Sequence, residues 1–292
     1  MKFTWLMLTA TLMISCNHLF YHPQKEQISN PEKFGMEYLP FRIPTTDGES
    51  LAAWKIPAQG TKIATVVHFH GNAQNMTTHF AYVAWLTKYG FDVIVFDYRG
   101  YGESSGTPSR EGLVRDGISV LLNTDETGTP FYVLGQSLGG AVAIPAIAES
   151  PPSNLKAIAI ESSFGNYRRI ARKKLGNLWL TWPLQYPLSL LVSSGWDPED
   201  YANKIKIPAV VIHGDQDPVI PIDEGKTLYD ALNSKPKYLW TLTGAGHTQA
   251  FQASDSPFKT KLVAFFCSEH PNPDKCLKRT KIRQPPLKIN AH

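Results

Sequence analysis

The chain has 292 residues and a formal net charge of +4, which falls to +3 if Lys2 is removed with an N-terminal signal. A charge this small does not indicate a nucleic-acid partner. Gly100-Tyr101-Gly102 lacks the strand-to-helix setting of a dinucleotide site, and the sequence carries no phosphate-binding loop. We therefore expect no nucleotide cofactor.

The N-terminus has the features of an export signal. Lys2 is followed by the apolar stretch 3–14, which is too short to span a bilayer. Residues 13–16, Met-Ile-Ser-Cys, resemble the lipobox of bacterial lipoproteins, although Met13 stands where Leu is usual. We expect residues 1–16 to be a signal peptide and Cys16 to be lipidated. An ordinary cleaved signal or an uncleaved anchor stays open.

The polar residues 17–35 are predicted to tether the domain to that anchor. Asn17 follows the cysteine where an aspartate would mark retention at the inner membrane. The expected location is therefore an exported, membrane-anchored lipoprotein on the periplasmic side, at the outer membrane in a Gram-negative cell. The alternative is a secreted or periplasmic protein.

Apolar runs then alternate with amphipathic stretches. A turn at 45–48 predicts an antiparallel edge hairpin, and the later runs, nearly continuous in apolar character, predict strands covered on both faces. Alternation of strand and helix predicts a mostly parallel, doubly wound α/β sheet. The expected strands are 36–43, 50–56, 63–69, 91–96, 130–134, 155–160, 208–213 and 237–242, and the expected helices are 78–89, 109–123 and 221–232.

The most informative motif is Gly135-Gln136-Ser137-Leu138-Gly139. It lies between an apolar strand and a helix rich in small residues, which is the context of a nucleophile elbow. Glycines two residues before and after the serine remove side chains that would collide in so tight a turn. Pro145 breaks the pattern inside the following helix, which we expect to kink or end early.

At this point the chain resembles the α/β-hydrolase superfamily, and its serine aminopeptidase-like, membrane-associated branch in particular. The resemblance runs from about residue 37 to 266 and implies an eight-stranded α/β-hydrolase fold with a short helical cap. The motifs that carry it are 70–73 (His-Gly-Asn-Ala), 97–102 (Asp-Tyr-Arg-Gly-Tyr-Gly), the elbow, 213–217 (His-Gly-Asp-Gln-Asp) and 244–247 (Gly-Ala-Gly-His).

A serine nucleophile needs a base, and the base needs an orienting carboxylate. The superfamily order of Ser, acid, His makes His247 the base, because the later His270 and His292 lie in a polar tail. Asp217 fits the family pattern for the acid. Asp215 and Glu161 are the alternatives.

An oxyanion hole needs two backbone donors. The elbow geometry predicts Leu138 N–H as one, and the resemblance places the other at Asn72, with Ala73 as the fallback. His68 and His70 lie at alternate strand positions, but no carboxylate or cysteine cluster accompanies them, so we expect no metal.

Two further residues near this site, Asp97 and Arg99, are expected to form a structural pair that braces a turn. They are not assigned a catalytic role.

The stretch 164–206 is too long for a simple crossover and predicts an inserted cap of short helices. Its first part, 168–174, is basic, and its second part, 178–196, is apolar and aromatic. A solvated basic face over a packed cap is the ordinary interpretation, and contact with anionic lipid headgroups is the alternative.

Cys267 and Cys276 form an even pair that would make a disulfide in an oxidising compartment. The predicted organisation is a hydrolase domain over 36–268 and a basic, disordered tail over 269–292. We expect a serine hydrolase that needs no cofactor and acts on carboxylic esters or thioesters, of acyl-lipid type, through an acyl-enzyme. A serine peptidase or aminopeptidase, or a noncatalytic binding module, is the alternative.

Overall fold

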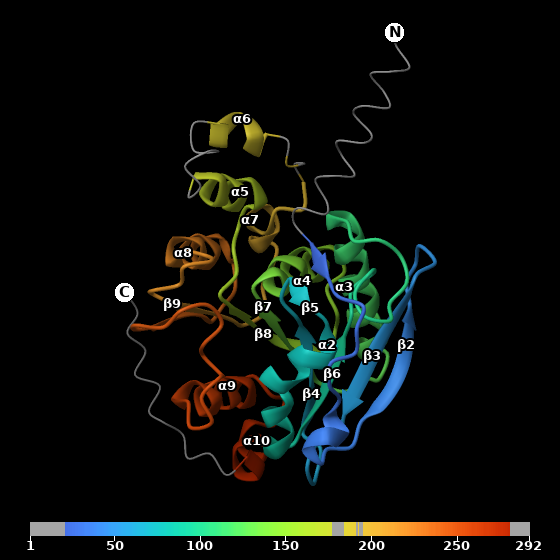
Figure 1. Ribbon diagram of the computed structural model, residues 1–292. Coiled ribbons are helices and arrows are strands. Elements are labelled where there is room, and N and C mark those ends of the chain that lie inside the picture. Colours follow the sequence, from blue (N-terminus) through green and yellow to red (C-terminus); the bar gives the residue numbers. More distant parts are fainter. Residues whose placement is uncertain (1–20, 177–183, 191, 193–194, 281–292) are drawn as a thin grey trace.

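An eight-stranded sheet forms the middle of the molecule (Figure 1). The computed structural model describes residues 21–176, 184–190, 192 and 195–280. The strand order is β10-β9-β8-β7-β4-β6-β3-β2. Near one edge β3 pairs antiparallel with both β2 and β6, and the other pairs in this sheet are parallel. The strands are β2 (Leu39–Pro44), β3 (Ser50–Ile56), β4 (Ala64–Phe69), β6 (Phe91–Phe96), β7 (Phe131–Gln136), β8 (Leu155–Glu161), β9 (Ala209–Gly214) and β10 (Lys237–Leu242).

This architecture confirms the predicted α/β-hydrolase fold. Successive residues of a strand point to opposite faces, and both faces are covered, so an internal strand is apolar at most of its positions. In β7, Phe131 and Val133 belong to one hydrophobic core, while Tyr132 and Leu134 belong to the other.

Helices cover the two faces. The first core packs under α3 (Arg110–Asp125), α4 (Leu138–Glu149), α7 (Pro198–Ala202) and α8 (Ile222–Ala231). The second packs under α9 (Pro257–Ser268), α10 (Pro273–Thr280) and the 3₁₀ helices η2 (Phe80–Tyr82) and η3 (Ala84–Tyr89). The remaining elements are β1 (His22–Pro23), β5 (Ala73–Gln74), η1 (Pro31–Phe34), α2 (Met76–His79), α5 (Tyr167–Gly176) and α6 (Gln185–Ser189).

Two helix predictions need correction. The expected helix 78–89 is α2 followed by η2 and η3, because Asn75 caps α2 early and Val83, at φ −125°, interrupts the helical backbone. The helix does not end early at Pro145, since α4 continues to Glu149.

The predicted domain boundaries also differ at both ends. Residues 21–35, expected as part of a tether, include β1, which pairs in parallel with β5, and the helix η1. The expectation of disorder is wrong for the first part of the tail, because α10 is joined to α9 by a disulfide between Cys267 and Cys276. The predicted signal peptide, Cys16 and the tail beyond Thr280 lie outside the described residues.

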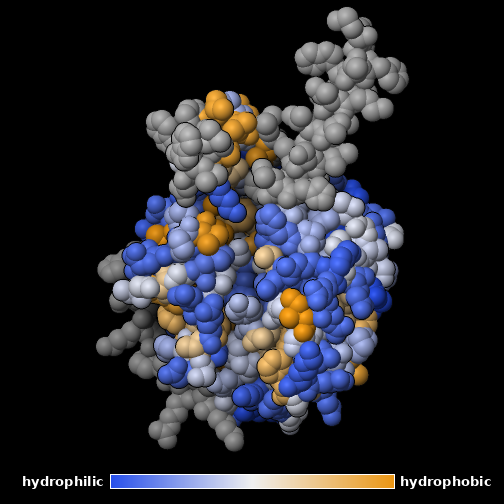
Figure 2. Space-filling model, viewed as in Figure 1, coloured by the Kyte–Doolittle hydropathy of each residue, from blue (hydrophilic) through white to orange (hydrophobic). Residues whose placement is uncertain are grey.

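The insertion between β8 and β9 contains α5, α6 and α7, and α5 and α6 stand beyond the sheet as a cap (Figure 1). Apolar side chains gather over α6 in Figure 2, where Leu184 and Leu190 are 52% and 64% exposed. Within the described ranges, no helix has the length and apolar character to cross a bilayer.

Candidate active site

The elbow holds Ser137 in a strained conformation between β7 and α4. Its φ is +53°, a region that side chains other than glycine rarely adopt. Close packing explains the glycines: a Cβ at Gly139 would overlap the Phe69 carbonyl of β4, and one at Gly135 would lie 2.7 Å from Cα of Gly140. The turn therefore presses α4 against the sheet and leaves the serine at the strand end.

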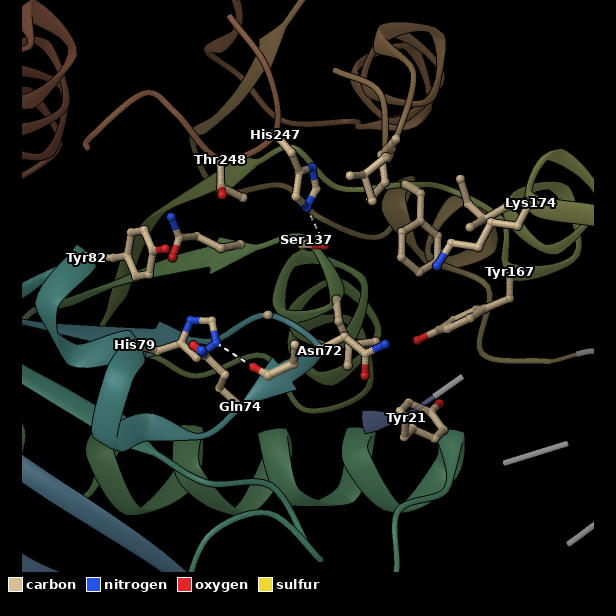
Figure 3. Close-up of a pocket in the computed structure, with 18 residues that line it drawn as sticks. Tyr21, Asn72, Gln74, His79, Tyr82, Ser137, Tyr167, Lys174, His247 and Thr248 are labelled. Carbon is tan, nitrogen blue, oxygen red and sulfur yellow. Dashed lines mark hydrogen bonds between the residues drawn. The ribbon is translucent and has the colours of Figure 1, made fainter. Parts of the chain in front are cut away.

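Ser137, His247 and Asp217 form one chain of hydrogen bonds. His247 Nε2 lies 3.1 Å from Ser137 Oγ, and its Nδ1 lies 2.7 Å from Asp217 Oδ2 (Figure 3 shows the first of these contacts). The structure thus brings together three residues that come from three separate strand ends. Both distances are those of hydrogen bonds, so a proton can pass from the hydroxyl to the imidazole.

Asp217 is held as a carboxylate. Its Oδ1 accepts from the N–H groups of Val219 and Ile220 at 2.8 and 2.9 Å. Burial on its own would raise the pKa of Asp217, but hydrogen bonds from His213, His247 and Ile220 outweigh it and hold the pKa below its ordinary value. A permanent negative charge therefore faces Nδ1 of His247.

The two alternative acids point elsewhere. Glu161 accepts from Gln136 Nε2 at 2.5 Å and from Ala250 N–H at 2.8 Å. Asp215 accepts from Gly244 N–H at 2.7 Å and so stabilises the turn that precedes His247. Neither makes the contact with His247 that Asp217 makes.

The two predicted oxyanion residues line the same cavity as Ser137. Leu138 is the first residue of α4, where an N–H has no partner within the helix. Asn72 precedes β5, and its side-chain oxygen accepts from His22 N–H at 3.2 Å and from the Tyr101 hydroxyl at 2.9 Å. Ala73, the fallback donor, lies in β5 itself and also lines the cavity.

The histidines beside this loop are buried among aromatic rings. His70 stacks on His79 at 5.0 Å between ring centroids, and His68 Nε2 lies 2.8 Å from Gln136 Oε1. Burial holds the pKa of His68 well below its ordinary value. Among the described residues, no group of three or more His, Cys, Asp or Glu is arranged to hold a metal ion.

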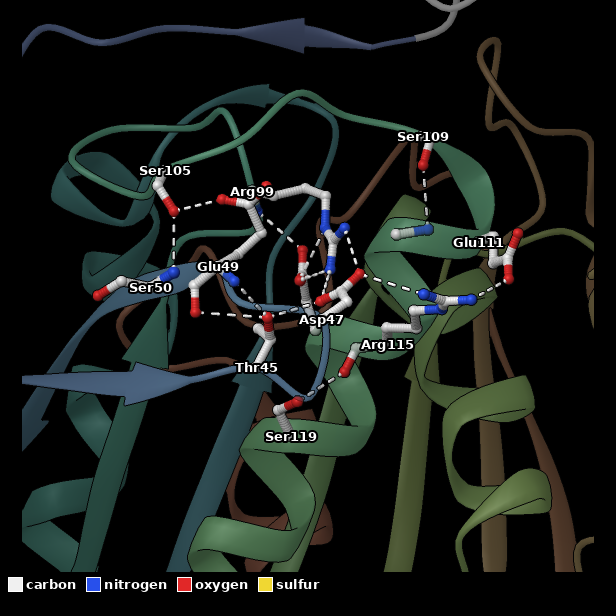
Figure 4. Close-up of polar contacts among 12 residues, drawn as sticks. Thr45, Asp47, Glu49, Ser50, Arg99, Ser105, Ser109, Glu111, Arg115 and Ser119 are labelled. Carbon is white, nitrogen blue, oxygen red and sulfur yellow. Dashed lines mark hydrogen bonds and ion pairs between the residues drawn. The ribbon is translucent and has the colours of Figure 1, made fainter.

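The expected pairing of Asp97 with Arg99 is wrong. Asp97 instead accepts from Met76 N–H at 2.6 Å. Arg99 binds Asp116 and Asp47 with distances of 2.8 and 2.9 Å, and Asp47 in turn binds Arg115 (Figure 4). Asp97 and Arg99 thus bind separate partners and do not contact each other as an ion pair.

The cavity above Ser137 has a volume of about 360 Å³. Cap residues Phe164, Tyr167, Ile170 and Lys174 form one wall, and Tyr82 and His79 lie on the opposite side (Figure 3). Among the described lining residues there is no Asp or Glu, and Lys174 is the one Lys or Arg. The described part of the cavity wall is therefore mostly apolar in surface, with the positive charge of Lys174 at its cap side.

Sequence reasoning missed two features of this cavity. Tyr21, only 4% exposed, forms part of its wall although it belongs to the segment expected as a tether. Gln136, the residue before the nucleophile, links His68 to Glu161 through its amide. The apolar run of β7 ends in a glutamine, and this could have indicated the role of Gln136. No local sequence feature indicated that Tyr21 forms part of the wall.

Comparison with known proteins shows the family of the chain. Residues 60–195 match the protein family described as "Serine aminopeptidase, S33". The uncharacterized protein YfhR of Escherichia coli (strain K12) is 32% identical over 261 residues, which cover 86% of this chain and 87% of YfhR. The chain belongs to the α/β-hydrolase superfamily.

Other members of the α/β-hydrolase superfamily extend the likeness. The Pyrococcus furiosus esterase Pf2001 has the same fold, with a TM-score of 0.70, 24% identity, and coverage of 86% of this chain and 98% of the esterase. The mouse lysophosphatidylserine lipase ABHD12 is 30% identical over 191 residues, or 61% of this chain and 47% of the lipase. This chain is therefore an α/β-hydrolase-fold enzyme.

Proposed function

We propose that this enzyme is a serine esterase that cleaves carboxylic esters or thioesters of acyl-lipid type through an acyl-enzyme. The observation that carries the proposal is the hydrogen-bonded chain from Ser137 through His247 to Asp217 on the wall of an apolar cavity. Packing of the fold does not by itself require these three residue types in a hydrogen-bonded chain. Their presence therefore argues against a noncatalytic binding module.

In the proposed mechanism, Ser137 Oγ attacks the substrate carbonyl carbon while His247 Nε2 takes its proton. The N–H groups of Leu138 and Asn72 hold the oxyanion. As the tetrahedral intermediate collapses, His247 gives that proton to the departing alcohol or thiol. Water then attacks the acyl-enzyme by the same route and releases the carboxylic acid and the free serine.

The lining of the cavity favours esters over peptides. An aminopeptidase must bind a free α-ammonium group, for which a carboxylate is the usual partner. The described residues of the cavity wall include no carboxylate and do include Phe164, Ile170 and Val219, which suit an acyl chain. The name of the mouse relative, a lysophosphatidylserine lipase, supports an acyl-lipid substrate for this chain as part of the proposal.

The test is labelling with a fluorophosphonate probe, followed by assays on p-nitrophenyl esters of increasing chain length. We expect Ser137-dependent labelling, and ester hydrolysis that exceeds hydrolysis of aminoacyl p-nitroanilides. Ser137→Ala is the control. Folded protein that is not labelled would refute the esterase, and a preference for the anilides would favour the peptidase.

We further propose that the enzyme is an exported lipoprotein attached through Cys16. The resemblance of residues 13–16 to a lipobox supports attachment, and the bond between Cys267 and Cys276 supports an oxidising compartment. The mass of the N-terminal peptide from membrane-extracted protein tests it. A diacylglyceryl group on Cys16, lost in Cys16→Ser, is expected, and an unmodified Met1 N-terminus would refute cleavage and lipidation.

A further inference from the structure

The segment from Tyr21 to Ile28, which we call the strap, crosses the loop 72–75 beside the nucleophile. His22 and Pro23 pair in parallel with Ala73 and Gln74. Figure 1 shows β1 lying against β5 at the cap side of the sheet. Segments some fifty residues apart in sequence thus form one small unit at the wall of the cavity.

The strap bonds the loop through both asparagine side chains that flank β5. His22 N–H donates to Asn72 Oδ1 at 3.2 Å. Asn75 Nδ2 donates to the carbonyls of Gln24 and Glu26 at 3.0 and 2.8 Å. Asn75 is fully buried, so these bonds replace water that its amide cannot otherwise reach.

The strap is itself fixed to the domain on both sides of these contacts. Gly102 N–H donates to the Gln24 carbonyl at 2.8 Å, and Ile28 N–H donates to Thr77 Oγ1 at 3.1 Å. At the other end the buried Tyr21 hydroxyl bonds Arg110 and Tyr167, which belong to α3 and the cap. The strap therefore holds a fixed position against the loop.

The loop needs such support. Gln74 has φ +67°, a left-handed conformation that costs a residue other than glycine or asparagine about 1 kcal/mol or more. A strained, exposed loop relaxes unless its surroundings hold it. In the proposed reaction Asn72 N–H must lie within hydrogen-bond distance of the oxyanion, and displacement of a donor by about 1 Å is enough to slow catalysis.

We propose that the strap positions the oxyanion loop, so that Tyr21 to Ile28 are part of the catalytic apparatus and not of a passive tether. This inference rests on the proposed function. The working enzyme then begins at Tyr21 and not near residue 36. Because Tyr21 is the fifth residue after Cys16, the proposed lipid anchor lies within about 18 Å of the cavity wall at full extension.

The test replaces Asn75 by Ser in the full chain. Serine still caps α2, as the Asn75 oxygen does by accepting from Thr77 N–H, but it cannot donate to the strap. The matched control is Asn30→Ser, the same substitution at the cap of η1, where the side chain accepts from Lys33 N–H. His22→Pro is the second variant, and it removes the N–H that donates to Asn72. His22 is exposed and lies in a strand, so the substitution changes no buried side chain.

The assay is p-nitrophenyl butyrate hydrolysis, with rates expressed per fluorophosphonate-titrated site. We expect kcat to fall at least tenfold in Asn75→Ser and His22→Pro, KM to change less than twofold, and Asn30→Ser to match the wild type. Because a trifluoromethyl ketone forms an oxyanion on the serine, its inhibition constant should rise by the factor lost in kcat/KM.

Rates per site equal to those of Asn30→Ser in both variants would overturn the inference. So would a lower kcat with an unchanged inhibition constant for the ketone, because the oxyanion donors would then be in place. Absence of labelling and hydrolysis in the wild type would instead refute the proposed esterase, so the two failures are distinguishable.

Discussion

Gln136 donates a hydrogen bond from Nε2 to Glu161 Oε2 at 2.5 Å, directly beside the residue proposed as nucleophile. The other Glu161 oxygen accepts from Ala250 N–H. Burial raises the pKa of Glu161, whereas hydrogen bonds hold the pKa of Asp217 down. Two acids at neighbouring strand ends therefore have different tasks: Glu161 connects buried elements, and Asp217 orients the imidazole.

Asp217→Asn should accordingly lower kcat by about a thousandfold or more, because the amide removes the charge that stabilises the imidazolium. Glu161→Ala should keep kcat per titrated site within about tenfold while costing roughly 2 to 3 kcal/mol of stability, since it strands two buried donors. Ester turnover and urea unfolding measure the two effects. Asp215→Ala serves as the control. Retained activity in Asp217→Asn would show that another residue is the acid of the triad.

The elbow glycine Gly139 gives a second prediction. A methyl group there meets the Phe69 carbonyl, so Gly139→Ala should cost more than about 2 kcal/mol and remove Ser137-dependent labelling. Gly128→Ala is the comparison, because Gly128 has a positive φ of +66° but nothing within 4 Å of the added carbon, so that variant tests backbone strain without a steric overlap. That variant should lose only about 1 kcal/mol and remain labelled. Equal losses in the two variants would contradict the steric argument.

The sheet could be predicted from sequence because its strands are buried on both faces. In a segment such as Phe91–Phe96 every position except Asp92 is apolar, and the predicted and observed bounds coincide. The Gly-x-Ser-x-Gly motif could be predicted because close packing at the turn requires both glycines. A Cβ at Gly135 would collide with Gly140, and one at Gly139 would collide with Phe69 of the neighbouring strand.

The strap could not be predicted in this way. Its contacts use backbone groups of His22, Gln24 and Glu26, which carry no side-chain signature, and the residues that bind them lie about fifty positions away. A polar composition therefore indicated a tether. The helix α10 was missed in the same way, because it follows a polar stretch. The sequence predicted the disulfide that joins α10 to α9 but not the helix itself.

The buried histidine of β4 makes stability depend on pH. The pKa of His68 is held well below its ordinary value by burial, so the unfolded chain binds a proton near pH 6.5 that the folded chain does not. Stability should therefore fall as pH decreases from about 7 to 4, by up to about 1.4 kcal/mol per pH unit for this group. His68→Gln, which keeps a donor toward Gln136, should give a shallower fall in urea unfolding between pH 7 and pH 5. Parallel pH profiles for the two proteins would show that His68 does not contribute.

The disulfide gives a prediction that separates stability from activity. Replacing Cys267 and Cys276 together by Ser should lower stability by roughly 2 to 3 kcal/mol, because the unfolded chain regains the freedom of the closed loop. Ester turnover at 25 °C should stay within twofold, since α10 lies at the end of the molecule away from the cap (Figure 1). Reductant should destabilise the wild type and leave the double variant unchanged. A large loss of turnover in folded double variant would link α10 to the site.

Lys174 should determine how the enzyme treats charged acyl groups. It lines the cavity from α5, and no carboxylate among the described lining residues offsets its charge. An ester whose acyl chain ends in a carboxylate should therefore gain an interaction that a neutral ester of equal length cannot make. Lys174→Met should lower kcat/KM for the p-nitrophenyl monoester of a dicarboxylic acid by about tenfold, equivalent to about 1.4 kcal/mol, and leave the neutral ester unchanged. Lys173→Met is the matched control, because it removes a neighbouring charge that does not line the cavity. Equal effects of the two substitutions would show that the preference comes from the overall charge of the cap and not from Lys174.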